Sequence, residues 1–281
     1  MHERTSLPSW SGLATLDDDA IPLFSSALLI ARDEYPRLDH AVYEQLIEAH
    51  TRALRPRVDS AAHWPLKMMA INRYLFDEQG YAGNHEAYHD PRNSYLNEVC
   101  ERRLGIPLSL GLLQMEVARR LGLGLDGVSF PGHFLVRLPV DGGVLVMDPF
   151  NRGRPLDVDE LRERALAHLD GRDLDDQVLH QILHPASNRA ILVRMLRNLY
   201  AVYVQRADWD RALRCVDRVL CLLPDDADAL RDRGLCYFRL RHLRGARDDL
   251  ARYLQARPGA GDAERVRELL IVASGERSRL H

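Results

Sequence analysis

The chain has 281 residues, 46% of them hydrophobic and 28% charged, a composition typical of a soluble globular protein with a substantial core. No apolar run approaches the roughly 18 residues of a membrane-spanning helix, and Met1-His2-Glu3-Arg4 does not resemble a secretory signal. Cys100, Cys215, Cys221 and Cys236 show no CxxC spacing. We therefore expect reduced core thiols in a cytoplasmic protein, and no membrane association.

The net charge of −3 is unevenly distributed along the chain. Residues 1–183 carry 19 basic and 28 acidic groups (−9), and residues 184–281 carry 19 and 13 (+6). This asymmetry indicates an acidic partner for the C-terminal half, attraction between the halves, or simple drift. Aromatic residues do not interleave with the arginines as a stacking surface requires, so nucleic-acid binding is not expected.

We predict an N-terminal tail over residues 1–20 and a helical region over residues 21–83. Apolar residues recur there at helical spacing, first Leu28, Ala31 and Tyr35 and then Tyr43 and Ile47.

His85-Glu86-Ala87-Tyr88-His89 matches the HExxH motif of zinc metallopeptidases. That chemistry needs both histidines on one face of a continuous helix. Glycines before the motif and Asp90-Pro91 after it limit any helix here to about two turns, so we predict a polar loop without metal.

Two helices are predicted next, separated by Gly105. Asp90-Pro91 resembles an N-cap followed by proline at the first helical position, which predicts a helix running to near Gly105. Pro107 starts a second helix, which we expect to stop at Gly122.

The following segment has the pattern of a small antiparallel sheet. Val128–Phe130, His133–Leu138 and Val144–Met147 are predicted strands, and Asp141-Gly142-Gly143 is a hairpin turn signal. In the second strand His133, Leu135 and Arg137 share one face, and the alternate residues share the other. The sequence therefore predicts an α+β domain over residues 21–183, with a helix packed on a small sheet.

The C-terminal third contains an internal repeat. Four residue pairs are each separated by 34 residues, the period of tetratricopeptide (TPR) helix pairs: Tyr203 and Tyr237, Ala212 and Ala246, Leu220 and Leu254, Pro224 and Pro258. The predicted helices are 187–205, 209–222, 226–239 and 243–256, with a capping helix at 261–273. We predict a TPR-like domain over residues 184–281, which serves either as a groove for a protein or peptide partner or as a structural brace.

Three short blocks carry the pattern of a catalytic site. Gly105–Leu110 starts a helix, Pro131-Gly132-His133-Phe134 opens a strand, and Asp148–Asn151 follows the next strand. Papain-like and transglutaminase-like sites use this order, with a cysteine thiol at the helix N-terminus. No cysteine stands at that helix start.

Together with 90–99 and Phe130–Leu135, these blocks resemble the SirB-type family over roughly residues 35–260. Those are bacterial proteins with a transglutaminase-like core followed by TPR repeats, loosely associated with regulation of invasion genes. The core also resembles one in an F-box protein of eukaryotic ubiquitin ligases. The resemblance implies the two-domain architecture described above.

The resemblance places the superfamily's catalytic histidine on His133 and its aspartate on Asp148. A gapless alignment puts the cysteine on Pro107, and a two-residue slip puts it on Ser109. Cys100 is no substitute, because it lies on the apolar face of the preceding helix. Either Ser109, His133 and Asp148 form a working triad, or the site is a vestigial one kept as a fold element or binding pocket.

Two functions follow from these alternatives. The first is a non-catalytic or weakly catalytic regulatory protein, a pseudoenzyme whose TPR region recruits a protein partner. The second is a papain-like hydrolase or acyltransferase that acts on peptide or amide bonds through Ser109, His133 and Asp148. Neither requires a metal or cofactor.

Overall fold

The computed structural model describes residues 7–168 and 174–275. It divides into two compact units, Met1–Pro8 with Asp17–Met195 and Ser9–Leu16 with Leu196–His281. The predicted boundary at residues 183 and 184 precedes α9, whereas this division falls inside that helix. Within the described ranges, no helix has both the length and the apolar character needed to cross a bilayer.

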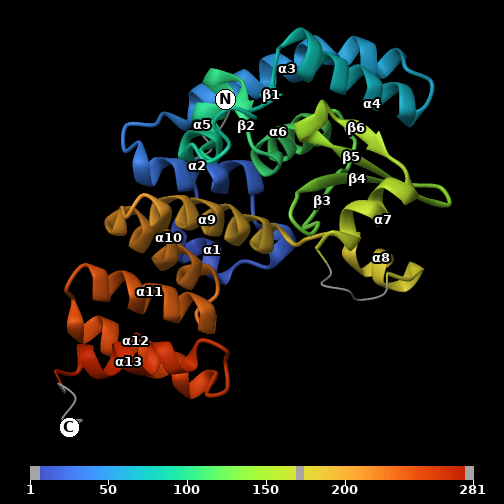
Figure 1. Ribbon diagram of the computed structural model, residues 1–281. Helices are drawn as coiled ribbons and strands as arrows, with labels where there is room; N and C mark the ends of the chain where they lie inside the picture. Colours follow the sequence, from blue (N-terminus) through green and yellow to red (C-terminus); the bar gives the residue numbers. More distant parts are fainter. Residues whose placement is uncertain (1–6, 169–173, 276–281) are drawn as a thin grey trace. The chain divides into compact units, whose positions relative to one another are not determined.

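The first unit is mixed α and β (Figure 1). Its α-helices are α2 (Leu23–Glu34), α3 (His40–Ser60), α4 (Trp64–Asn72), α5 (Leu96–Arg102), α6 (Pro107–Arg120), α7 (Val158–Leu166) and α8 (Asp176–Ile182). Shorter helical turns are η1 (Asp18–Ala20), η2 (Arg73–Glu78), η3 (Pro91–Asn93) and η4 (Pro149–Asn151). Its strands are β1 (Ala82–Gly83), β2 (Leu104–Gly105), β3 (Asp126–Val128), β4 (Leu135–Val140), β5 (Gly143–Asp148) and β6 (Arg154–Leu156).

The main sheet has the order β3-β4-β5-β6 and is antiparallel throughout, while β1 and β2 form a separate parallel pair. Val140 pairs with Gly143, so Asp141 and Gly142 make the turn of the predicted hairpin. Gly142 has a φ of +83°, a conformation in which glycine is strongly favoured. The hairpin is confirmed, although β4 is displaced by two residues, β5 is one residue longer at each end, and β6 was not predicted.

Helices cover both faces of this sheet (Figure 1). On one face Phe134 and Val136 lie so close to Gly111 of α6 that an added Cβ would come within 2.8 Å and 3.2 Å of them. On the other face Leu135 joins a core cluster with residues of α7 and α8, including Leu161 and Leu179. The predicted alternation of the β4 side chains is therefore confirmed, and it fixes the sheet between α6 and the α7–α8 pair.

The start and end of α6 agree with the prediction. Pro107 is its first residue, where a missing N–H costs nothing. The helix ends at Arg120, and Gly122 follows with a φ of +82°.

The single helix predicted from Pro91 to near Gly105 is wrong. The segment forms η3 and then α5, separated by Tyr95 in an extended conformation. The Asn93 side chain donates to the carbonyls of Ala87 and Tyr88, at 2.7 Å and 3.2 Å, and so belongs to the preceding loop. Asp90 caps only η3, through the N–H of Arg92 at 3.0 Å.

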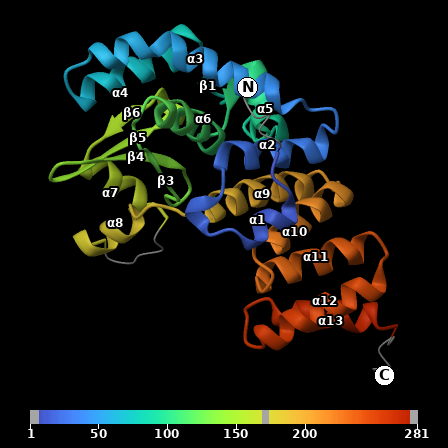
Figure 2. The ribbon, with the colours of Figure 1, turned by 180° about the vertical axis from the view of Figure 1, so that it is seen from behind.

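The second unit is all-helical. It contains α1 (Trp10–Thr15), the C-terminal part of α9 (Asn188–Gln205), α10 (Trp209–Leu222), α11 (Ala227–Arg239), α12 (Leu243–Ala256) and α13 (Ala263–Ala273). Helices α9 to α13 match the five predicted C-terminal helices within two residues, and Figure 2 shows α10 to α13 in succession. The repeated alanines Ala212 and Ala246 are fully buried. The range predicted as an N-terminal tail contains α1, whose Trp10 packs under the Arg218 guanidinium of α10, 4.9 Å from the ring centroid.

Candidate functional site

Two of the three predicted site residues lie together. His133 precedes β4 and Asp148 ends β5, and these strands are hydrogen-bonded neighbours. The His133 Nε2 lies 2.8 Å from the Asp148 Oδ1. The turn that presents His133 contains Gly132, which has a φ of +65° and lies against His168. The imidazole remains partly accessible, with 21% of its side chain exposed.

Asp148 is fully buried and accepts four hydrogen bonds. Oδ1 accepts from His133 and from the Phe150 N–H at 3.0 Å, and Oδ2 accepts from Asn151 at 2.6 Å and Arg164 at 2.9 Å. Burial alone raises the pKa of this carboxyl, but the bonds from His133, Asn151 and Arg164 outweigh it and hold the pKa well below its usual range. The carboxylate is therefore ionised and fixed in one orientation, so it can orient and stabilise the imidazole.

Ser109, the third candidate, is fully buried in the first turn of α6. Its hydroxyl donates to the carbonyl of Asn93 at 2.6 Å and accepts from the N–H of Ile106 at 3.1 Å. Among the described residues no hydrogen bond joins Ser109 to His133. The hydroxyl caps the helix start and ties it to η3, so its single proton is committed to the backbone.

The other two positions considered for a nucleophile are also buried. Pro107 is a buried first-turn residue without a reactive group. Cys100 lies in the core on α5, and burial raises the pKa of its thiol to about 12. A thiol with that pKa is protonated at neutral pH and is a poor nucleophile.

Phe150 joins the HExxH segment to this site. Its ring lies 4.4 Å from that of His85, 5.8 Å from that of Tyr88 and 6.2 Å from that of His133, centroid to centroid. Gly83 permits this packing, because an added Cβ would lie 2.5 Å from the Phe150 ring. Residues 85–89 form a turn and not a helix. In the described ranges no three His, Cys, Asp or Glu side chains are grouped so as to hold a metal ion.

Two arginines complete the site and were not predicted. Arg164 of α7 binds Asp148, and it also pairs with Glu160 four residues earlier at 2.6 Å. Arg194 donates to the backbone carbonyl of His133 at 2.5 Å and lies over the Phe134 ring. The Glu160–Arg164 spacing is an ordinary helical ion pair, so nothing in the sequence indicated a contact with Asp148. Asn151, by contrast, was already part of the Asp148–Asn151 block.

Comparison with known proteins agrees with this architecture. The family model described as the transglutaminase-like superfamily matches residues 41–197, more than half of the chain, and a tetratricopeptide repeat model matches residues 199–271. A UPF0162 protein of Xylella fastidiosa is 59% identical over 281 residues, all of both chains. A UPF0162 protein of Vibrio cholerae is 31% identical over 253 residues, which cover 88% of this chain and 91% of that protein.

Protein SirB1 of Salmonella typhimurium is 27% identical over 222 residues, 76% of this chain and 78% of that protein. No solved structure matches. The chain therefore belongs to the UPF0162, SirB-type family of transglutaminase-like proteins, in agreement with the His133–Asp148 pair on adjacent strands and with the TPR helices.

Proposed function

We propose that the protein is a non-catalytic regulatory protein that binds a protein or peptide partner through its TPR unit. The observation that carries this proposal is the Ser109 hydroxyl, which is fully buried and bonded to the Asn93 carbonyl at 2.6 Å. A serine nucleophile needs a base within hydrogen-bonding reach and access to substrate. Ser109 has neither, so the core is best explained as a scaffold.

The TPR unit supports binding through a polar cluster on α9 and α11. Arg231 and Asp232 pair at 2.8 Å, and Arg197 pairs with Asp226 at 2.7 Å with half of its side chain exposed. Burial raises the pKa of Asp232 and also that of Tyr200, and the negative charge of Asp232 raises the pKa of Tyr200 further. Tyrosine and arginine, which this cluster presents on neighbouring helices, are residue types enriched at protein interfaces.

A photo-crosslinking residue at position 200 of the full chain tests this proposal in cells. We expect a discrete crosslinked partner that persists when His133→Ala or Ser109→Ala is added. The same residue at exposed position 163 of α7 is the control and should yield no such product. Failure to crosslink from position 200, or loss of the product in His133→Ala, would contradict a partner site that is independent of the core.

The alternative is a hydrolase or acyltransferase that uses Ser109, His133 and Asp148. The 2.8 Å bond between His133 and Asp148 favours it, because this is the orienting half of a triad. It further requires that Ser109 leave its bonds to Asn93 and Ile106 and reach the imidazole. Covalent capture of Ser109 that depends on His133 distinguishes the two functions.

A further inference from the structure

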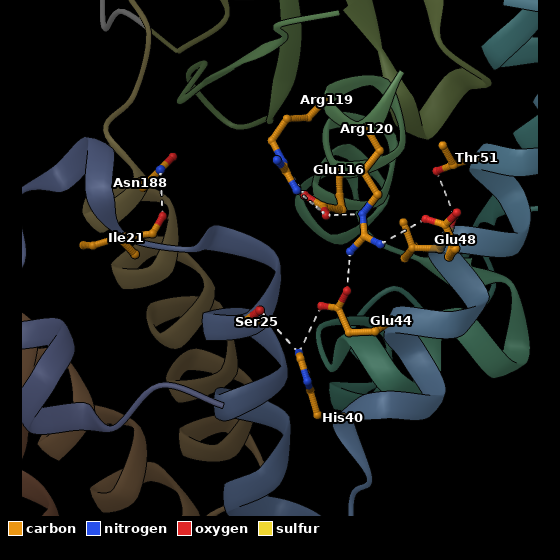
Figure 3. A network of polar contacts seen from close by, with 11 residues as sticks. Ile21, Ser25, His40, Glu44, Glu48, Thr51, Glu116, Arg119, Arg120 and Asn188 are labelled. Carbon is orange, nitrogen blue, oxygen red and sulfur yellow. Dashed lines mark hydrogen bonds and ion pairs between the residues drawn. The ribbon is translucent and has the colours of Figure 1, made fainter. Parts of the chain in front are cut away.

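Two cavities in the first unit differ in how their polar groups are paired. The larger, of about 650 Å³, lies between the segment Asp19–Ser25 and the C-terminal half of α6. Figure 3 shows its charged wall, in which Glu116 accepts from both Arg119 and Arg120, and Glu44 bridges Arg120 and His40. These charges largely neutralise one another within the protein.

The smaller cavity, of about 480 Å³, is net acidic. It lies between the turn that follows α2, the first part of α3, and α5. Its lining contains three carboxyl groups and one guanidinium, from Glu34, Glu98, Glu101 and Arg37. The remaining lining residues are Tyr35, Pro36, Leu38, Tyr43 and Asn97. We refer to it below as the α5 cavity.

Asn97, which lines the α5 cavity, has a buried side-chain oxygen without a donor in the described part of the chain. The residue is only 4% exposed, and its Oδ1 has no hydrogen-bond partner among the described residues. Buried side-chain oxygens are nearly always hydrogen-bonded, and an unpaired one costs about 1–3 kcal/mol. A ligand that brings an N–H group into the cavity would remove this cost.

Glu101 is oriented within the same cavity. The Tyr43 hydroxyl donates to its Oε1 at 2.5 Å. Burial and this contact with Glu101 raise the pKa of Tyr43, so the phenol remains a donor and fixes one carboxylate oxygen. The second oxygen of Glu101 makes no ion pair or hydrogen bond with a described residue, and it can accept from a ligand.

Aromatic groups form part of the wall. Tyr35 packs edge-to-face on Tyr95, with centroids 5.5 Å apart at 88°, which holds it at the cavity. Tyr43 is 7% exposed. Flat aromatic faces beside carboxylates favour a planar, weakly hydrated cation over a compact, strongly hydrated ammonium.

We propose that the α5 cavity binds a guanidinium group. Its N–H groups would reach the second oxygen of Glu101, the unpaired Oδ1 of Asn97 and the Glu98 carboxylate, since guanidinium presents five donors in one plane. Two sources share this chemistry, an arginine side chain in a peptide and a free arginine-like molecule. The transglutaminase-like core would thus have a recognition site of its own, beyond the proposed TPR site.

Titration calorimetry on the full chain tests this at low salt. The probes are N-acetyl-arginine-methylamide, free arginine and the matched N-acetyl-lysine-methylamide. We expect saturable 1:1 binding of an arginine compound, at least about tenfold tighter than the lysine compound. Tighter binding of the capped form indicates a peptide source, and tighter binding of free arginine indicates a small molecule. Absence of saturable binding, or equal affinity for lysine, would overturn the proposal.

Variants localise the site. Glu101→Gln should weaken binding by about tenfold or more, because it removes a charge-assisted bond, whereas Glu163→Gln on exposed α7 should leave affinity unchanged. Asn97→Leu should weaken binding while raising the unfolding temperature, because the unpaired oxygen is lost. If Asn97→Leu does not fold, Glu98→Gln replaces it as the second variant. Binding that is equally strong in both glutamate-to-glutamine variants at 101 and 98 overturns the assignment.

Discussion

The two ends of the candidate site use hydrogen bonds in opposite ways. At the strand end, a buried carboxylate with four donors holds an imidazole that remains partly exposed. At the helix end, a fully buried serine uses its hydroxyl to join η3 to the start of α6. The orienting half of a triad is thus present while the residue at the nucleophile's end stabilises the fold. This difference between the two ends is what the proposal of a non-catalytic core rests on.

The largest effect is expected at Asp148, the centre of the strand end. Asp148→Ala removes a fully buried carboxylate that accepts four hydrogen bonds, and should lower the free energy of unfolding by about 3–5 kcal/mol. Urea unfolding measures this change. Asp141→Ala, in the exposed hairpin turn, is the matched control and should change it by less than about 0.5 kcal/mol. Similar values for the two variants would remove the structural role assigned to Asp148.

Ser109→Ala probes the helix end. It removes the bonds of the Ser109 hydroxyl to the Asn93 carbonyl and from the Ile106 N–H, and these two groups keep only a long bond to each other, at 3.4 Å. The variant should therefore cost about 1–3 kcal/mol of unfolding free energy. Ser129→Ala, at an exposed position of the same unit, should be nearly neutral. A neutral or stabilising Ser109→Ala would indicate that the hydroxyl is kept for chemistry and not for the fold.

Lowering the pH should affect the strand end and not the helix end, because only the strand end carries an ionised group, Asp148. The folded-state pKa of Asp148 is lowered, so its stabilisation is fully present above the unfolded pKa of about 3.9 and is lost as pH falls below that value. Below about pH 4 the difference between wild type and Asp148→Asn should shrink by about 1.4 kcal/mol per pH unit. Urea unfolding of both proteins from pH 6 to pH 2.5 measures it, and a constant difference would contradict the account.

The smallest effect is expected at His133. His133→Ala removes one of four donors to Asp148 and leaves the rest, so it should cost only about 1 kcal/mol. Thermal unfolding beside Asp148→Ala gives the ranking directly. A loss as large as that of Asp148→Ala would mean that the imidazole is a structural element.

The sequence predicted the TPR helices well, because a 34-residue period reports packing between neighbouring helices. Ala212 and Ala246 recur at that period and are fully buried. The predicted hairpin is also confirmed, because Asp141-Gly142 is a turn signal that depends only on neighbouring residues. The break between η3 and α5 was missed because the Asn93 side chain bonds to a loop that propensity does not reveal.

Only part of the candidate site could be predicted from the sequence, again because some of its contacts join distant segments. His133 and Asp148 lie on adjacent strands of one hairpin, so their pairing follows from local order. The partners that decide the role of the third residue come from elsewhere: Asn93 is 16 residues before Ser109. Arg164 likewise reaches Asp148 from α7, and no motif marks that contact.

Reactivity of Ser109 tests the central claim most directly. The full chain would be treated with a fluorophosphonate, which labels activated serines, and then examined by intact mass and peptide mapping. We predict no adduct at Ser109 in the wild type, and the same result in His133→Ala. A stoichiometric adduct at Ser109 that disappears in His133→Ala would show a working nucleophile and would contradict the non-catalytic account.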